Sequence, residues 1–195
     1  IGNPPYVNVE LMPKADKEYY RETYKTFFKR SDLFSLFLEL ATNKLSSKGY
    51  ISYIIPSIIL NNLSYKYTRE NILSNNWLSE VCYTGSKVFK DATVDTAILI
   101  LDKAIRHSNI NLIEAIDFFN PQAQQVELDY FEKYDNNISV GNASTNLITD
   151  KIFKDEFEVS ENHFQIFQGV VTGNNKAFIY DDIDSAKEKG IEKEL

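Results

Sequence analysis

A short apolar run limits the fold of this 195-residue chain more than any other feature. Residues 50–55 read Tyr-Ile-Ser-Tyr-Ile-Ile, and Pro56 closes the run. An uninterrupted run of this kind is typical of a strand buried on both faces, as in a parallel sheet. It follows a helical pattern in which apolar residues recur every three or four positions over residues 33–45, with Ser31 or Asp32 as the cap and Gly49 after its end. A helix therefore leads directly into a buried strand.

The remaining patterns extend this alternation. Residues 64–75 favour a second helix, while residues 77–83, 96–101 and 109–116 favour strands. This order predicts an α/β layer fold with a largely parallel sheet. Residues 14–30 indicate a loop with a short helix. We expect residues 1–116 to form one domain, 117–160 a polar linker with a helix near 146–156, and 161–195 the start of another domain with two short strands.

Composition excludes several classes of protein. The longest apolar runs are far too short to span a membrane, and no basic segment followed by an apolar region opens the chain as a signal peptide would. We therefore expect a cytoplasmic protein. Cys82 is the single cysteine, which excludes an internal disulfide and a cysteine-rich metal site, and only His107 and His163 could add imidazole ligands. No metal site is predicted.

Charge is unevenly distributed along the chain. The net charge of −7 argues against a free-standing nucleic-acid binder. However, residues 1–110 contain 14 Lys/Arg and 11 Asp/Glu, whereas residues 111–195 contain 7 and 17. Basic residues gather within 17–30, interleaved with tyrosine and phenylalanine. This cluster is either a solvated face or a loop that faces DNA, and the acidic second half suits an interaction segment.

The most informative motif is Asn3-Pro4-Pro5-Tyr6, which follows what looks like the end of a buried strand. The Asn3 side chain and the Pro4 carbonyl each offer a hydrogen-bond acceptor. Two consecutive prolines fix φ and donate no N–H, so the turn is rigid and rich in acceptors. Tyr6 adds a flat face for stacking. Ligands of open α/β sheets bind at the carboxyl ends of strands, where this turn lies.

Two fixed acceptors and a stacking face suit the exocyclic amine of a nucleobase. Hydrogen bonds from its N–H groups would orient the nitrogen lone pair without any charged base. The base must first leave the duplex, because its amine is otherwise paired. Stacking on Tyr6 would then hold it, at roughly 1–3 kcal/mol per aromatic contact.

This tetrapeptide resembles the catalytic motif of gamma-type N6-adenine DNA methyltransferases, in particular those of type IIG restriction-modification enzymes. Downstream segments strengthen the resemblance. Residues 32–39 resemble the helix after the catalytic loop, residues 49–56 the next strand, residues 88–97 the loop whose phenylalanine packs on the target base, and residues 168–178 the start of the target-recognition domain. Only the linker at 117–160 lacks a counterpart.

The resemblance implies a fold, a reaction and a set of site residues. Residues 1–116 would be the C-terminal half of a Rossmann-like S-adenosylmethionine-dependent methyltransferase sheet, followed by the linker and the start of the recognition domain. The reaction would methylate adenine N6 in double-stranded DNA, with a fused or associated endonuclease. Asn3, Pro4, Pro5 and Tyr6 would be catalytic, Tyr6 and Phe89 would contact the base, Phe37 would approach the methyl donor, and Asn174, Asn175 and Lys176 would contact DNA.

One departure stands against this pattern. The glycine-rich loop that binds S-adenosylmethionine precedes the catalytic motif in this family, and the present sequence has no Gly-x-Gly run. We therefore expect a piece of a longer protein that alone binds the cofactor weakly or not at all and does not catalyse. A half-sheet also has an open edge, which predicts self-association.

Alternatives stay open at the level of sequence. The amine could belong to cytosine, RNA or protein, or the chain could be a non-catalytic DNA-specificity or scaffolding module. Asn3–Tyr6 and residues 172–176 could be ordinary turns. Phe37 and Phe89 could be core residues, since phenylalanine is usually buried and Phe37 lies on the apolar helical stripe.

Overall fold

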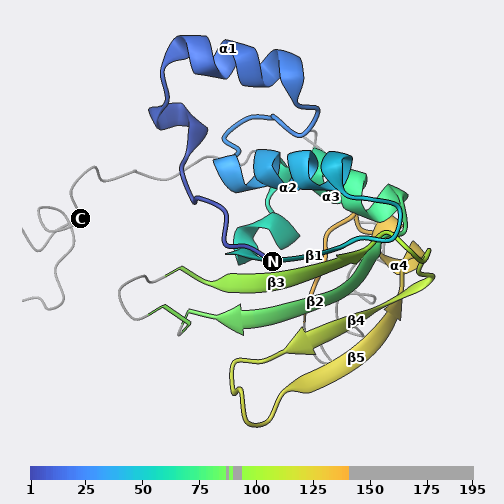
Figure 1. The fold of residues 1–195 in the computed structure, drawn as a ribbon. Coiled ribbons are helices and arrows are strands. Elements are labelled where there is room, and N and C mark those ends of the chain that lie inside the picture. Colours follow the sequence, from blue (N-terminus) through green and yellow to red (C-terminus); the bar gives the residue numbers. More distant parts are fainter. Residues whose placement is uncertain (87, 90–93, 141–195) are drawn as a thin grey trace, which may run out of the picture. The chain divides into compact units, whose positions relative to one another are not determined.

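The computed structural model describes residues 1–86, 88–89 and 94–140, all within one compact unit, Ile1–Lys154. Its centre is a five-stranded sheet in the order β1-β3-β2-β4-β5 (Figure 1). The strands are β1 (Tyr50–Pro56), β2 (Leu78–Gly85), β3 (Thr96–Asp102), β4 (Asn109–Glu114) and β5 (Gln122–Glu127). The helices are α1 (Lys14–Thr23), α2 (Leu33–Lys44), α3 (Lys66–Ser74) and α4 (Asp129–Glu132), with 3-10 turns at Val9–Leu11, Ser57–Leu60 and Leu63–Tyr65.

The prediction of a largely parallel sheet is wrong for these strands. β3 lies between β1 and β2 and is antiparallel to both, and β5 is antiparallel to β4. Only the pair β2 and β4 is parallel. The reason lies in the connections: about ten residues join β2 to β3, fewer than the dozen or more that a parallel crossover requires. The α/β class itself is confirmed, and the sheet is mixed.

Strand directions nevertheless create one shared edge. β1 and β2 are both antiparallel to β3, and β4 is parallel to β2, so β1, β2 and β4 run in the same direction. Their carboxyl ends, at Pro56, Gly85 and Glu114, therefore lie at the same edge of the sheet. We call this the carboxyl edge.

The core lies between one face of the sheet and the helices α2 and α3, which cover that face in Figure 1. Inward-facing residues of the central strands are fully buried, and α2 and α3 contribute matching apolar residues. The largest contributors are Phe34, Leu38, Ile55, Tyr65, Ile72, Leu78, Leu99 and Leu101. The four predicted strands and the helices near 33–45 and 64–75 are thus confirmed, as is a short helix within 14–30.

The opposite face of the sheet departs from expectation. The run at 50–55 predicts burial on both faces, but Ser52 and Ile54 of β1 are only half-buried, and so are Ile98 and Ile100 of β3. Within the described chain, helices cover only the face that carries Ile51 and Ile55. The second face is apolar in sequence but half-exposed in this part of the protein.

The sheet also continues past residue 116, into the stretch expected to be a linker. β5 pairs with β4 along its whole length, and the following residues Leu128, Phe131 and Ile138 are buried in the core. The expected helix at 146–156 and the strands beyond it lie outside the described residues. In the described part, no helix is long and apolar enough to cross a membrane.

Candidate functional site

The Asn3–Tyr6 turn begins where a short extended segment leaves the sheet. Gly2 forms a parallel bridge with Tyr53 of β1; its N–H donates to Ser52 O at 2.9 Å, and its carbonyl accepts from Ile54 N at 3.1 Å. A Cβ at Gly2 would lie 2.9 Å from Tyr53 Cε1, so any larger residue here would force the Tyr53 ring to shift. The turn therefore follows a single extended residue that is bridged to β1, rather than the end of a buried strand, and it lies at the carboxyl edge.

The acceptors of the turn are available for a ligand. Asn3 and Pro5 are exposed, while Pro4 is buried. Within the described residues, no partner of the Asn3 side chain is found, and no backbone hydrogen bond uses the Pro4 carbonyl. Two prolines restrict φ at positions 4 and 5, which limits the backbone conformations of the turn.

Tyr6 is held more firmly than the rest of the turn. Its hydroxyl donates to Ile54 O of β1 at 3.1 Å, and its ring meets Phe34 edge-on, with centroids 6.2 Å apart and planes at 79°. Burial raises the pKa of the phenol, so it stays neutral and keeps donating at physiological pH. The half-buried ring is thereby fixed against Phe34 and β1, two residues after Pro4 in the chain.

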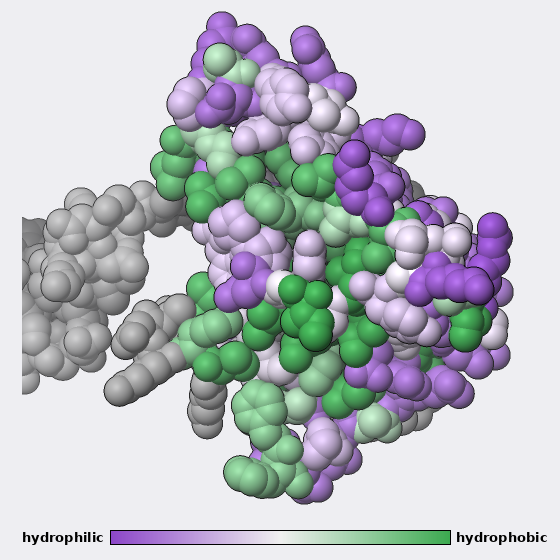
Figure 2. Space-filling model, in the orientation of Figure 1, coloured by the Kyte–Doolittle hydropathy of each residue, from purple (hydrophilic) through white to green (hydrophobic). Residues whose placement is uncertain are grey.

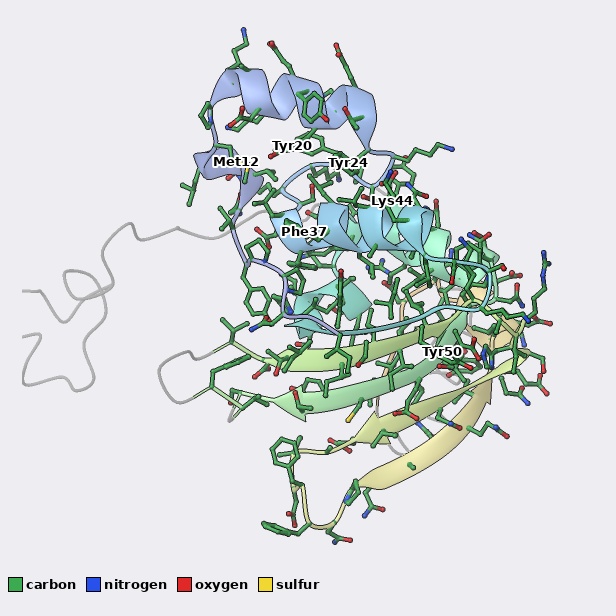
Figure 3. The ribbon with its side chains drawn as sticks, in the orientation of Figure 1. Met12, Tyr20, Tyr24, Phe37, Lys44 and Tyr50 are labelled. Carbon is green, nitrogen blue, oxygen red and sulfur yellow. The ribbon has the colours of Figure 1, made fainter. Side chains whose placement is uncertain are left out.

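An apolar pocket of about 340 Å³ adjoins the turn. Pro5 forms one part of its wall, the face of α2 with Leu33 and Phe37 a second, and Tyr20 and Tyr24 a third. Leu36 and Leu40 complete the lining. In Figure 3, Tyr20 and Tyr24 lie between α1 and α2, and Phe37 lies on α2. Figure 2 shows apolar residues gathered below α1.

Phe37 belongs to this pocket rather than to the core. Its side chain is 41% exposed, although it lies on the apolar stripe of α2. The core side of the helix is instead formed by Phe34 and Leu38, which are almost completely buried. Phe37 therefore lines the pocket beside Pro5, and its approach to the methyl donor stays a prediction.

Sequence reasoning missed Tyr20 and Tyr24. α1 has no buried residue, so burial does not distinguish a pocket wall from a solvated face in this helix. A buried carboxylate fixes the loop after α1: Glu39 accepts from the backbone N–H groups of Lys25 at 3.2 Å and Thr26 at 2.9 Å. The four-residue spacing of the two tyrosines, on one side of the helix, is the signal that could have revealed them.

Phe89 lies at the same edge of the sheet but on a different strand end. It is half-buried in the segment after β2. β1 and β3 separate β2 from the Gly2 segment, which amounts to roughly 14 Å at the usual strand spacing. Phe89 therefore follows the strand end of β2 at the carboxyl edge, on a different strand from the Asn3–Tyr6 turn.

The remaining candidates are three residues of the expected recognition domain and the basic cluster. Asn174, Asn175 and Lys176 lie outside the described residues. The basic cluster within 17–30 is exposed on α1 and the following loop, where Arg30 pairs with Glu10 at 2.9 Å and Arg21 lies over the Phe27 ring. In the ranges that the structure describes, no group of side chains could hold a metal ion.

Comparison with known proteins supports the resemblance drawn from the motif. Residues 1–89 match the model of the Eco57I restriction-modification methylase family. The chain is 36% identical over 123 residues to the type II restriction enzyme and methyltransferase RM.Eco57I of Escherichia coli, an alignment that covers 60% of this chain and 12% of that protein. The chain thus spans about an eighth of that relative.

Two solved structures share the fold. One is a type I restriction-modification methyltransferase subunit from Streptococcus thermophilus, with a TM-score of 0.57, 16% identity, and coverage of 71% of this chain and 36% of that one. The other is the type IIG restriction endonuclease BpuSI, with a TM-score of 0.54, 17% identity, and coverage of 77% and 21%. The predicted resemblance to methyltransferases of restriction-modification enzymes is confirmed.

Proposed function

We propose that this chain, which is homologous to restriction-modification methyltransferases, forms the catalytic half of an enzyme that methylates adenine N6 in double-stranded DNA. The observation that supports this proposal is the Asn3–Tyr6 turn: within the described chain no hydrogen bond of the Asn3 side chain or the Pro4 carbonyl is found, and Tyr6, two residues after Pro4, is held by its bond to Ile54 O. The target is an amine rather than a ring carbon, because acceptors bind N–H groups and no cysteine nucleophile lies in the turn.

The turn would act by orienting the amine. The two N–H groups of an extrahelical adenine would donate to Asn3 Oδ1 and the Pro4 carbonyl. Both acceptors become better paired as the nitrogen turns pyramidal and gains positive charge, so they stabilise the transition state more than the ground state. Tyr6 would stack on the base, and Phe89 would contact it from the side of β2.

The pocket fits the adenosyl part of S-adenosylmethionine. Its lining is apolar and aromatic, which suits a flat, uncharged ring system, and Pro5 joins it directly to the catalytic turn. Pro5, Leu33 and Phe37 would hold the cofactor. When bound, S-adenosylmethionine supplies a methyl group on a positively charged sulfur.

The remaining parts of the enzyme would lie outside this chain or outside its described residues. The sequence has no glycine-rich cofactor loop, so this half alone should not catalyse. Residues 161–195 would begin the recognition domain that reads the DNA, with Asn174, Asn175 and Lys176 at its start. The type IIG resemblance implies an endonuclease in the same protein.

The decisive experiment is methyl transfer by the full-length protein that carries this chain. It would be incubated with labelled S-adenosylmethionine and duplex DNA, and the modified nucleoside would be identified by mass spectrometry. We expect N6-methyladenine from the unaltered protein. Asn3→Ala should lower the rate at least about 100-fold, the usual cost of removing one preorganised partner of developing charge.

Tyr6→Ala and Tyr6→Phe separate stacking from anchoring. Tyr6→Ala should lower the rate strongly, while Tyr6→Phe keeps the stacking face and loses only the hydrogen bond to Ile54 O. A different methylated nucleoside would reassign the substrate, and a methylated protein or RNA would exclude DNA. An inactive full-length protein with an intact cofactor loop would contradict the proposal.

A further inference from the structure

The start of α2 contains an unusual pairing. Asp32 occupies the position before the first helical residue, where a carboxylate ordinarily accepts from the backbone N–H groups of the first turn. Its side chain makes no such bond. Instead, Asp32 Oδ2 accepts a hydrogen bond of 2.6 Å from the hydroxyl of Tyr65, 33 residues further along the chain.

Tyr65 connects this carboxylate to the catalytic turn through two ring contacts. Tyr65 is 1% exposed, and its ring stacks on Phe34 with centroids 5.1 Å apart and planes at 29°. Phe34, itself fully buried, meets Tyr6 edge-on. A continuous series of side chains therefore runs from Asp32 through Tyr65 and Phe34 to Tyr6.

The backbone makes a second connection between the same parts. Asn8 and Asp32 form an antiparallel bridge, Leu33 N–H donates to Val7 O at 2.9 Å, and Val9 N–H donates to Ser31 O at 3.3 Å. The segment that leaves the catalytic turn is thus paired with the residues that begin α2. Any shift of Asp32 would move both the turn and the first pocket residue of α2, Leu33.

We propose that Asp32 and Tyr65 are a positioning pair that fixes the position of Tyr6 relative to the start of α2. The stacking face for the base and the wall of the cofactor pocket therefore keep a fixed distance and orientation. Neither residue lines the pocket or belongs to the turn, so both act through their neighbours. The inference rests on the function proposed above. Because the donor is buried and the acceptor anionic, the bond is of the stronger, charge-assisted kind.

The test uses the full-length protein with Tyr65→Phe, Asp32→Ala and Asp32→Asn. Single-turnover methylation and DNA affinity are measured, and 2-aminopurine replaces the target adenine in a parallel set of duplexes. Stacking on a tyrosine quenches this fluorophore, so a flipped but poorly stacked base should be brighter. Tyr65→Phe and Asp32→Ala should slow methylation about tenfold, the effect of one such hydrogen bond, and raise the fluorescence, with DNA affinity within about twofold.

Asp32→Asn is the conservative variant. Its amide oxygen still accepts from the Tyr65 hydroxyl but carries no charge, so rate and fluorescence should lie between those of Asp32→Ala and those of the unaltered protein. Ser79→Ala is the matched control, because it removes a hydroxyl that donates to Ile100 O at 3.0 Å near the amino end of β2. It should change neither readout.

Two results would overturn the inference. One is Tyr65→Phe with unchanged rate and fluorescence, and the other is Asp32→Asn as impaired as Asp32→Ala. If the unaltered protein transfers no methyl group, the proposed function fails separately, and hydrogen exchange at the Leu33 amide still decides the positioning claim. That amide should exchange faster in Tyr65→Phe, and unchanged protection would contradict the pairing.

Discussion

At the scale of single residues, Phe37 offers the sharpest test of the pocket. Its ring is 41% exposed on α2, so Phe37→Ala removes a pocket wall without leaving a cavity in the core. Loss of one aromatic stacking surface should weaken S-adenosylmethionine binding by the full-length protein about 10- to 100-fold. Calorimetric titration with the cofactor measures this change, and DNA affinity should stay the same.

Tyr50→Ala is the matched control for this variant. Tyr50 is also an exposed aromatic residue, at 64%, but it begins β1 at the end opposite the carboxyl edge, and Figure 3 shows it well apart from Phe37. Its removal should leave cofactor affinity unchanged. Equal weakening by both variants, or none by Phe37→Ala, would mean that the cofactor does not occupy this pocket.

The Asn3–Tyr6 turn could be proposed as a site from the sequence because the proposed chemistry lies in four adjacent residues. Asn3 and Tyr6 need no distant partner to reveal an acceptor and a stacking face. The pair Asp32 and Tyr65 could not be predicted, because the two residues are far apart in sequence and each has an ordinary explanation alone. Asp32 reads as a helix cap and Tyr65 as a core aromatic, and only folding brings them to 2.6 Å.

At the scale of elements, Arg69 of α3 joins segments far apart in sequence. It is 2% exposed; its guanidinium donates to the carbonyls of Ile59, Asn62 and Asn136 and to Asn137 Oδ1, all within 2.9 Å. Burial lowers the pKa of this group, but arginine stays charged. Arg69→Met should lower the free energy of unfolding by about 3 kcal/mol or more, because it leaves buried carbonyls unpaired. Urea unfolding measures the loss.

Lys66→Met provides the comparison within the same helix. The Lys66 ammonium pairs with Asp135 at 3.5 Å and Glu70 at 4.0 Å, and its side chain is 32% exposed. Partly exposed pairs of this kind contribute at most about 1 kcal/mol, so this variant should differ little from the unaltered protein. Equal losses in the two variants would show that Arg69 contributes only charge and not its hydrogen bonds.

The helices and strands also show which features of the fold an apolar pattern does not predict. Apolar patterns located α2 and the first four strands, and the predicted helix at 64–75 overlaps α3, whose buried residues are Thr68, Arg69, Ile72 and Leu73. They gave the wrong strand directions, since direction depends on pairing partners and loop lengths rather than on the pattern. They missed β5 because Gln122–Glu127 is mostly polar, and an edge strand pairs through its backbone and needs few buried side chains.

At the scale of the whole molecule, the sheet explains why distant residues could serve one reaction. The Gly2 segment, β1, β2 and β4 all run in one direction, so the turn at Asn3–Tyr6 and the loop with Phe89 emerge at the same edge. The antiparallel β3 between β1 and β2 does not disturb this arrangement. The mixed sheet therefore has the shared carboxyl edge that is expected of a parallel sheet.

The same sheet leaves β1 with an open side. β3 pairs with β1 along its full length on one side, whereas on the other, within the described residues, only Gly2 forms a bridge. Unpaired backbone groups at such an edge favour pairing with a second chain.

We therefore expect residues 1–195, prepared alone, to self-associate in sedimentation velocity. Because the glycine-rich cofactor loop is missing, we also expect no calorimetric binding of S-adenosylmethionine. Replacing Ser52 by proline should reduce the association, because the Ser52 carbonyl faces this open side toward Gly2 and proline removes the backbone N–H donor of the same residue. A monomer at all concentrations would show that the edge is covered, and micromolar cofactor affinity would show that the pocket is complete without the glycine-rich loop.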